Sequence, residues 1–173
     1  EMQRSLVGSE MCIRDRLYAV AQKLPQYNFV FVGPEDDFFA QHPLHTLKNT
    51  YFTGHREVAE LPAYIQHFDV CLNPQKVNPI TEGNYPLKID EYLAIGKPVV
   101  ATSTHTMREV FAEYTHLATD VDSYLYAIQK ALGETEDAEL KNARIAFAQT
   151  HSWAHSVEKI YKAIDIYKTT SKK

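Results

Sequence analysis

The sequence predicts an α/β fold in which helices cover both faces of a parallel sheet. Short β-branched and aromatic runs alternate with segments of helical spacing, and most of these runs end at Gly, Asn or Pro. The 173 residues include 45% hydrophobic residues, which suits one domain with its own core. Strands that alternate with helices connect through right-handed crossovers. We therefore expect a doubly wound parallel sheet followed by C-terminal helices.

The elements of the first half follow from apolar spacing and turn residues. Residues 17–24 carry apolar side chains at helical spacing, and Pro25 ends that pattern. The β-branched and aromatic run that follows ends at Gly33 and is typical of a buried strand. In this half we expect a helix at 17–24, strands at 27–32 and 51–53, a helix at 57–68 and a strand at 69–72.

The second half begins with a loop at 75–85 that is rich in turn residues. Pro86 suits the first turn of a helix, because its missing N–H would have no partner there. Gly96 is a natural left-handed residue at the end of that helix. After it we expect a strand at 98–102, a helix at 106–114, a strand at 115–119, a helix at 123–132 and helical residues 136–168 broken near 151–153.

Residues 1–16 show neither strand alternation nor a helical stripe. They are not a secretory signal, because Glu1 and Glu10 stand where a basic start and an apolar core would be. We expect a foreign or disordered leader over 1–16 and one domain over 17–173.

Composition excludes several classes of protein. The chain has 18 basic and 22 acidic residues, a net charge of −4, so we expect no nucleic-acid partner. Two cysteines, Cys12 and Cys71, are too few for a disulfide framework or a thiolate metal cluster and fit the reducing cytoplasm. No apolar run approaches the roughly 20 residues of a membrane-spanning helix.

The segment most informative about chemistry is the loop at 75–85 with the helix that follows it. Ligands of open parallel sheets bind outside the carboxyl ends of the strands, and free N–H groups at a helix start attract phosphate. Lys88 and Glu91 are three residues apart, which places a cation and a carboxylate on one helix face. The cation suits a diphosphate and the carboxylate suits a ribose. The alternative is an exposed ion pair between Lys88 and Glu91, worth roughly 0.2–0.5 kcal/mol.

The run TEGNY followed by PLKIDEYLAIGKPVVAT resembles the signature helix of GT-B glycosyltransferases of the retaining, family-four type. From residue 17 onward FVFVG, YFTGH, DVCLNP and HSWAHSVEKIY follow in the order of that family's C-terminal domain. The resemblance implies a Rossmann-like half of a GT-B fold that binds a nucleotide-sugar donor. It implies sugar transfer to a hydroxyl acceptor in cell-surface glycan synthesis, without a metal or other cofactor.

The resemblance also assigns residues. Glu91 matches the acid that holds the ribose, and Lys88 matches the basic residue at the diphosphate. Glu82 and Lys88 are the candidate catalytic residues, and the expected lining of the phosphate pocket is Gly83, Asn84, Tyr85, Leu87 and Lys88. The family separates its two acids by seven residues, whereas eight residues separate Glu82 from Glu91. Either the loop returns Glu82 to the donor sugar, or the backbone of Gly83 and Asn84 holds the sugar.

These enzymes also open the domain with a strand and a basic turn, and carry an acceptor-binding N-terminal domain. Neither is recognisable before residue 17, so we expect a fragment that binds the donor but transfers no sugar alone. Peripheral membrane contact through the other domain stays open for the whole protein. A nucleotide-sugar epimerase of the same architecture and a non-catalytic nucleotide- or partner-binding module are the alternatives.

The histidines are weaker candidates. His42, His45 and His55 have no carboxylate or cysteine at usable spacing, so we expect no metal site. His55, with Arg56, is better placed to meet the nucleotide base at the end of a strand. For the pair His151 and His155, which flank Trp153, we expect packing rather than ligand binding.

Overall fold

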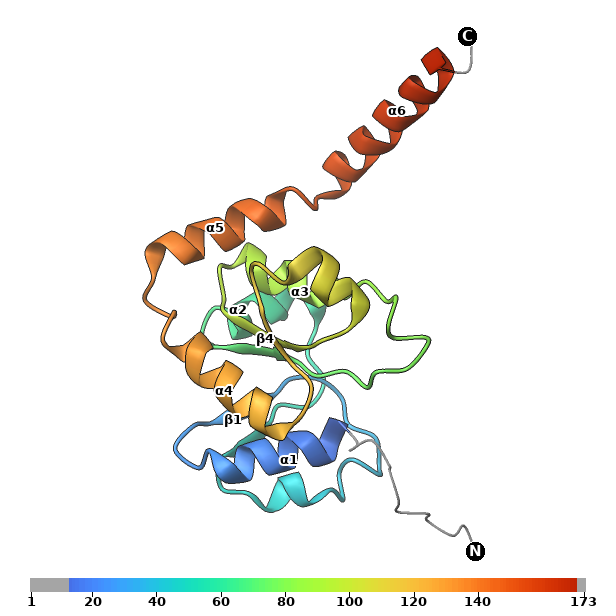
Figure 1. The fold of residues 1–173 in the computed structure, drawn as a ribbon. Helices are drawn as coiled ribbons and strands as arrows, with labels where there is room; N and C mark the ends of the chain where they lie inside the picture. Colours follow the sequence, from blue (N-terminus) through green and yellow to red (C-terminus); the bar gives the residue numbers. More distant parts are fainter. Residues whose placement is uncertain (1–12, 171–173) are drawn as a thin grey trace, which may run out of the picture.

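The computed structural model describes residues 13–170 (Figure 1). All strand pairs in this range are parallel. β1 (Phe29–Phe31) pairs with β2 (Thr50–Phe52), while β3 (Cys71–Asn73), β4 (Val99–Thr102) and β5 (His116–Ala118) form a three-stranded sheet in the order β3-β4-β5. The prediction of an α/β protein with parallel strands and flanking helices is confirmed.

The strands do not form the single continuous sheet that we expected. Within residues 13–170 no backbone ladder joins the β1-β2 pair to the three-stranded sheet. The two sheets are joined by side-chain packing instead, because Phe29 of β1 and Val100 of β4 lie in the same apolar cluster. An isolated bridge between Gly33 and Gly54 extends the β1-β2 pair at its carboxyl end.

Helices separate most of the strands. The α-helices are α1 (Ile13–Lys23), α2 (Leu61–Ile65), α3 (Leu87–Ala94), α4 (Val121–Leu132), α5 (Ala138–Gln149) and α6 (Trp153–Thr170). Two short 3-10 turns, η1 (Pro43–Thr46) and η2 (Val58–Glu60), and one π-helical turn, η3 (Met107–Phe111), complete the order.

Side chains of β4 point alternately into two cores, as expected for a strand buried on both faces. Val100 packs in a cluster with residues of α1, β1 and α4. Its neighbours Val99 and Ala101 pack in a second cluster with residues of α2, α3, η3 and α5. The prediction of helices on both faces is therefore confirmed at the strand that lies in the middle of the larger sheet.

The boundary of the expected leader is wrong. α1 begins at Ile13, so residues 13–16 belong to the domain, and Arg16 is 8% exposed. The Arg16 guanidinium lies 3.5 Å from the Thr102 hydroxyl and 5.7 Å from the Tyr124 ring, so packing buries a charged residue that the apolar pattern had excluded. The rest of the leader and Cys12 lie outside the described residues.

Two expected helices are shorter than predicted. Residues 57–68 form η2 and then a single turn, α2, with Pro62 in its first positions. Residues 106–114 form the π-helical turn η3 rather than a regular helix. π turns are wider than α turns and are found as single insertions, which apolar spacing does not indicate.

The break near residues 151–153 is confirmed, since α5 ends at Gln149 and α6 begins at Trp153. α6 extends away from the rest of the molecule, as the red helix in Figure 1 shows, and none of its residues is buried. His151 packs against Phe147 with ring centroids 4.4 Å apart, whereas Trp153 is 82% exposed. The expectation of packing is thus confirmed for His151, whereas the His155 side chain is 41% exposed and lies 3.9 Å from Glu158 Oε2. Within residues 13–170 no helix has both the length and the apolar character needed to cross a membrane.

Candidate functional site

The loop that follows β3 is fastened at its start to the carboxyl end of β4. The Gln75 main-chain N–H donates to the Thr102 hydroxyl over 2.7 Å, and that hydroxyl lies 3.1 Å from the Gln75 carbonyl. The Tyr124 hydroxyl is 2.8 Å from the same Thr102 oxygen, and burial raises the pKa of the Tyr124 phenol. Because Thr102 is 1% exposed, these bonds fix the loop at the sheet edge where parallel sheets bind ligands.

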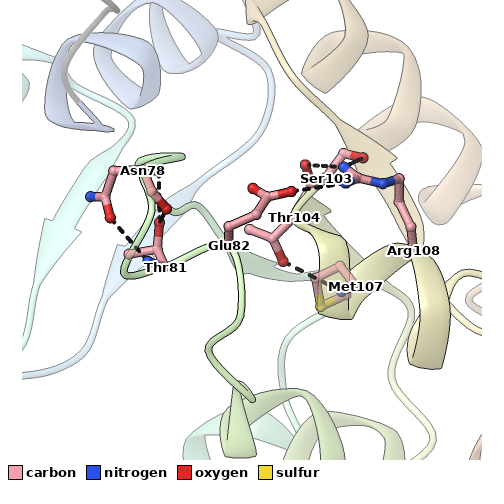
Figure 2. Close-up of polar contacts among 7 residues, drawn as sticks. All are labelled: Asn78, Thr81, Glu82, Ser103, Thr104, Met107 and Arg108. Carbon is pink, nitrogen blue, oxygen red and sulfur yellow. Dashed lines mark hydrogen bonds and ion pairs between the residues drawn. The ribbon is translucent and has the colours of Figure 1, made fainter.

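Asn78 folds the middle of the loop into a tight turn. Its Oδ1 accepts hydrogen bonds from the main-chain N–H groups of Ile80 and Thr81, each at 2.9 Å. The Thr81 hydroxyl accepts from the Asn78 N–H at 3.0 Å (Figure 2). Asparagine side chains commonly make such bonds to backbone two or three residues ahead. The turn brings Glu82 beside the segment that follows β4.

Glu82 is held by residues of that segment, as Figure 2 shows. Arg108 Nη2 donates to Glu82 Oε1 over 2.8 Å, and Arg108 Nη1 donates to the Ser103 carbonyl over 3.0 Å and to the Ser103 hydroxyl over 3.4 Å. The Thr106 N–H donates to the Glu82 carbonyl at 3.4 Å. The Glu82 side chain is therefore fixed from the β4 side of the site.

Three buried polar atoms in this region have no hydrogen-bond partner. They belong to the β3 end and to the loop after it: Asn73 Nδ2, Gln75 Oε1 and Glu82 Oε2. Gln75 contacts Thr102 and Glu82 is linked to Ser103, so these groups surround the carboxyl end of β4. An unpaired buried polar group costs about 1–3 kcal/mol and calls for an explanation such as a ligand. The arrangement offers both donors and acceptors to a polar ligand.

The loop ends at the first turn of α3, where Asp90 and His151 bind the Tyr85 side chain. The Tyr85 hydroxyl donates to Asp90 Oδ2 over 2.8 Å, and His151 Nδ1 lies 3.2 Å from that hydroxyl and 2.8 Å from Asp90 Oδ1. Burial, followed by the hydrogen bond to Asp90, raises the pKa of Tyr85. The neutral phenol thus links the end of the loop to the junction between α5 and α6.

The other predicted site residues form an exposed surface at this loop-to-helix junction. Gly83, Asn84, Leu87, Lys88 and Glu91 are all exposed. Lys88 and Glu91 share no ion pair in the structure, so the alternative of an exposed Lys88–Glu91 pair is not realised. In the first turn of α3 the Ile89 N–H donates to the Pro86 carbonyl over 2.9 Å, while the N–H groups of Leu87 and Lys88 precede the first hydrogen bond of the helix. The structure thus brings a cation, a carboxylate and free amides to one surface.

His55 lies elsewhere, after the carboxyl end of β2. Its side chain is 70% exposed, and its Nε2 is 3.4 Å from Glu57 Oε1. Within residues 13–170 no hydrogen bond or ion pair connects His55 to residues 82–91. The neighbouring Arg56 carries a buried, unpartnered Nε and lies 5.7 Å from the Tyr64 ring centroid.

The remaining histidines have structural contacts. His42 Nδ1 accepts from the Leu44 N–H at 3.2 Å, and His45 Nε2 lies 2.7 Å from Glu35 Oε2 while its ring stacks on Phe52. Across the part of the chain that the structure describes, no three metal-binding side chains come close enough to hold an ion.

A separate hollow lies at the opposite, amino end of β5. It has a volume of about 350 Å³, and its lining includes Tyr114, His116, Glu134 and Arg144. Glu134 pairs with the buried Arg144 and lies 3.0 Å from His116 Nε2. Because Arg144 and His116 both contact Glu134, we interpret these side chains as structural contacts that hold the end of α4 against α5 and β5.

Sequence reasoning missed Arg108, Ser103, Asn73, Gln75 and Thr102. Arg108 is 26 residues from Glu82, and nothing in the spacing of either residue links them. The sequence does predict the strand ends at which Asn73, Gln75 and Thr102 lie. Their position at the carboxyl edge of the sheet could therefore have marked them as candidate site residues.

The profile of the family described as glycosyl transferases group 1 matches residues 8–134. The chain is 34% identical over 157 residues to "Putative teichuronic acid biosynthesis glycosyltransferase TuaH" of Bacillus subtilis (strain 168). That alignment covers 87% of this chain and 39% of the relative, so the chain spans about two fifths of the relative's length. The matched region contains the β3 loop, α3 and Arg108, and the chain belongs to the family of group 1 glycosyl transferases.

Proposed function

We propose that this chain binds a nucleoside-diphosphate sugar and supplies the donor half of a glycosyltransferase. The observation that carries the proposal is the set of unpartnered polar atoms of Asn73, Gln75 and Glu82 beside the exposed start of α3. A sugar offers hydroxyl groups to such atoms, and a diphosphate suits the amides of a helix start. Membership of the glycosyl transferase family supports the same assignment.

In this proposal each group has one role. Lys88 and the amides of Gly83 and Leu87 stabilise the charge that develops on the leaving diphosphate, and no metal ion or other cofactor is required. The backbone of Asn84 lines the same pocket, with its N–H bonded to the Thr81 carbonyl at 3.2 Å. The backbone of Tyr85 continues this lining, and its side chain stays bound to Asp90. The lining residues and the helix dipole act together, because residues 83–88 lie at the amino end of α3.

Glu91 accepts hydrogen bonds from the two ribose hydroxyls, one helical turn further along the exposed face of α3. His55 and Arg56 meet the nucleobase at the end of β2. The unpartnered Nε of Arg56 supports this role, since it is a donor without an acceptor in the protein.

The acceptor is a hydroxyl group, and we propose a cell-surface polysaccharide as the product. The name of the relative, which refers to teichuronic acid biosynthesis, supports this class of product. Groups that activate the acceptor are proposed to come from a further domain, since the relative extends well beyond the aligned region. That domain is also the proposed point of membrane contact for an enzyme that works in the cytoplasm.

The experiment that tests donor binding is a titration with uridine or guanosine diphosphate followed by backbone amide shifts. We expect the amides from Gly83 to Lys88 to move first. Shifts confined to residues 42–55 would contradict the proposed pocket. Phosphate alone is the control, since it competes for the α3 amides without filling the ribose position at Glu91.

A further inference from the structure

Arg108 joins two parts of the site that are far apart in sequence. Its guanidinium donates to Glu82 from one nitrogen and to the carbonyl and hydroxyl of Ser103 from the other (Figure 2). Ser103 directly follows β4, so it is a fixed point of the sheet. A planar guanidinium can satisfy both partners at once, which an ammonium cannot do with the same geometry.

The contact leaves one Glu82 oxygen free for a ligand. Oε1 is occupied by Arg108, whereas Oε2 is buried and without a partner. A carboxylate oxygen accepts hydrogen bonds, so the free Oε2 suits a hydroxyl donor. Rotation of the carboxylate out of its plane would break the bond to Arg108, so Arg108 fixes the direction in which the unbonded Glu82 oxygen points.

The ion pair between Arg108 and Glu82 contributes little to the free energy of unfolding. The side chains of Arg108 and Glu82 are 47% and 34% exposed, and ion pairs with that exposure are weak. Arg108 also sits on η3, a π turn, and such turns occur frequently at functional sites. Both features favour a role in shaping the site.

We propose that Arg108, supported by Ser103, is a positioning residue that aims Glu82 Oε2 at a hydroxyl of the donor sugar. The inference rests on the proposed function and adds to it the residue that sets sugar recognition. It also explains how Glu82 reaches the site although one extra residue separates it from Glu91. Arg108 itself touches no donor atom in this proposal.

The test compares binding of two probes, UDP and UDP-glucose, to the full chain by calorimetry. For Arg108→Gln we expect UDP-glucose affinity to fall about fivefold to tenfold, while UDP affinity changes less than twofold. Arg108→Lys should lie between wild type and Arg108→Gln, since lysine retains one contact. Glu109→Gln, an exposed neighbour on the same turn, is the matched control and should change neither affinity.

A double-mutant cycle separates positioning from a direct role. In a Glu82→Gln background, Arg108→Gln should cause no further loss of UDP-glucose affinity, because its effect passes through Glu82. Additive losses would overturn the proposal, as would equal weakening of both probes by Arg108→Gln. Shifts by UDP outside residues 83–88 would instead count against the proposed function.

A measurement without ligand decides the case in which neither probe binds. Releasing Glu82 should move the amide resonances of Gly83 and Asn84 in free Arg108→Gln, and Glu109→Gln should leave them in place. Unchanged resonances in Arg108→Gln would show that Arg108 does not hold the loop. Far-UV circular dichroism of each variant confirms that it is folded.

Discussion

Replacing Gly96 by alanine tests the packing of the end of α3 against α5, which helps to position the proposed site. Gly96 follows the end of α3 with φ +80°, a conformation that costs an alanine roughly 1–2 kcal/mol. A Cβ there would lie 2.5 Å from Lys141 Cγ and 3.3 Å from the Lys141 carbonyl on α5. The lysine side chain can rotate away but the backbone cannot, which adds about 1 kcal/mol. We expect a loss of about 2–3 kcal/mol in the free energy of unfolding.

Urea denaturation followed by far-UV circular dichroism measures this loss, and the melting temperature should fall by about 4–12 °C. Gly133→Ala is the matched control: a Cβ there would also lie 3.3 Å from a backbone carbonyl, that of Lys130, but Gly133 has a right-handed conformation, φ −66°, that alanine adopts readily. Its stability should change by less than about 1 kcal/mol. Equal losses in the two variants would refute the argument from the left-handed turn.

Three further predictions concern single side chains. Glu91→Gln should weaken UDP binding by about 1–3 kcal/mol, whereas Glu82→Gln should change mainly the preference for UDP-glucose over UDP; equal effects on UDP would contradict these roles. Burial raises the pKa of the Cys71 thiol to about 12. Iodoacetamide at pH 8 should therefore label Cys71 slowly in the folded chain and rapidly in urea, as measured by peptide mapping. The contribution of the buried thiol to the free energy of unfolding should be lost as the pH rises from about 8.5 towards 12. Tyr85→Phe should lower the free energy of unfolding by about 1 kcal/mol, measured by urea denaturation, since it removes the hydrogen bond to Asp90. An unchanged free energy would show that this bond does not stabilise the fold.

Local patterns predicted the features of the fold that depend on neighbouring residues. The strand at 98–102, the turn residues of the loop at 75–85 and the left-handed Gly96 each follow from a few consecutive residues, and the structure confirms them. The start of α1 was missed because charged residues interrupt its apolar stripe, and Arg16 is buried through contacts with Thr102 and Tyr124.

The contacts that shape the site could not be predicted in the same way. Glu82 and Arg108 come from different segments, and only the fold brings them together. The same is true of Tyr85 and His151, which are 66 residues apart. Residue types at strand ends indicate where a site lies, but pairing between loops depends on the three-dimensional path of each loop.

The loop between β3 and α3 is held at three places that belong to different parts of the fold. Thr102 fixes its start, Arg108 fixes Glu82, and the pair Asp90 and His151 fixes Tyr85 at its end. Only the exposed residues 83–84 lie between the second and third anchors. A loop that is ordered before binding loses less conformational entropy when a ligand arrives. Arg108 and the Thr106 N–H both hold Glu82 from the β4 side, so contacts from outside the loop fix the residue whose spacing from Glu91 departs from the family pattern.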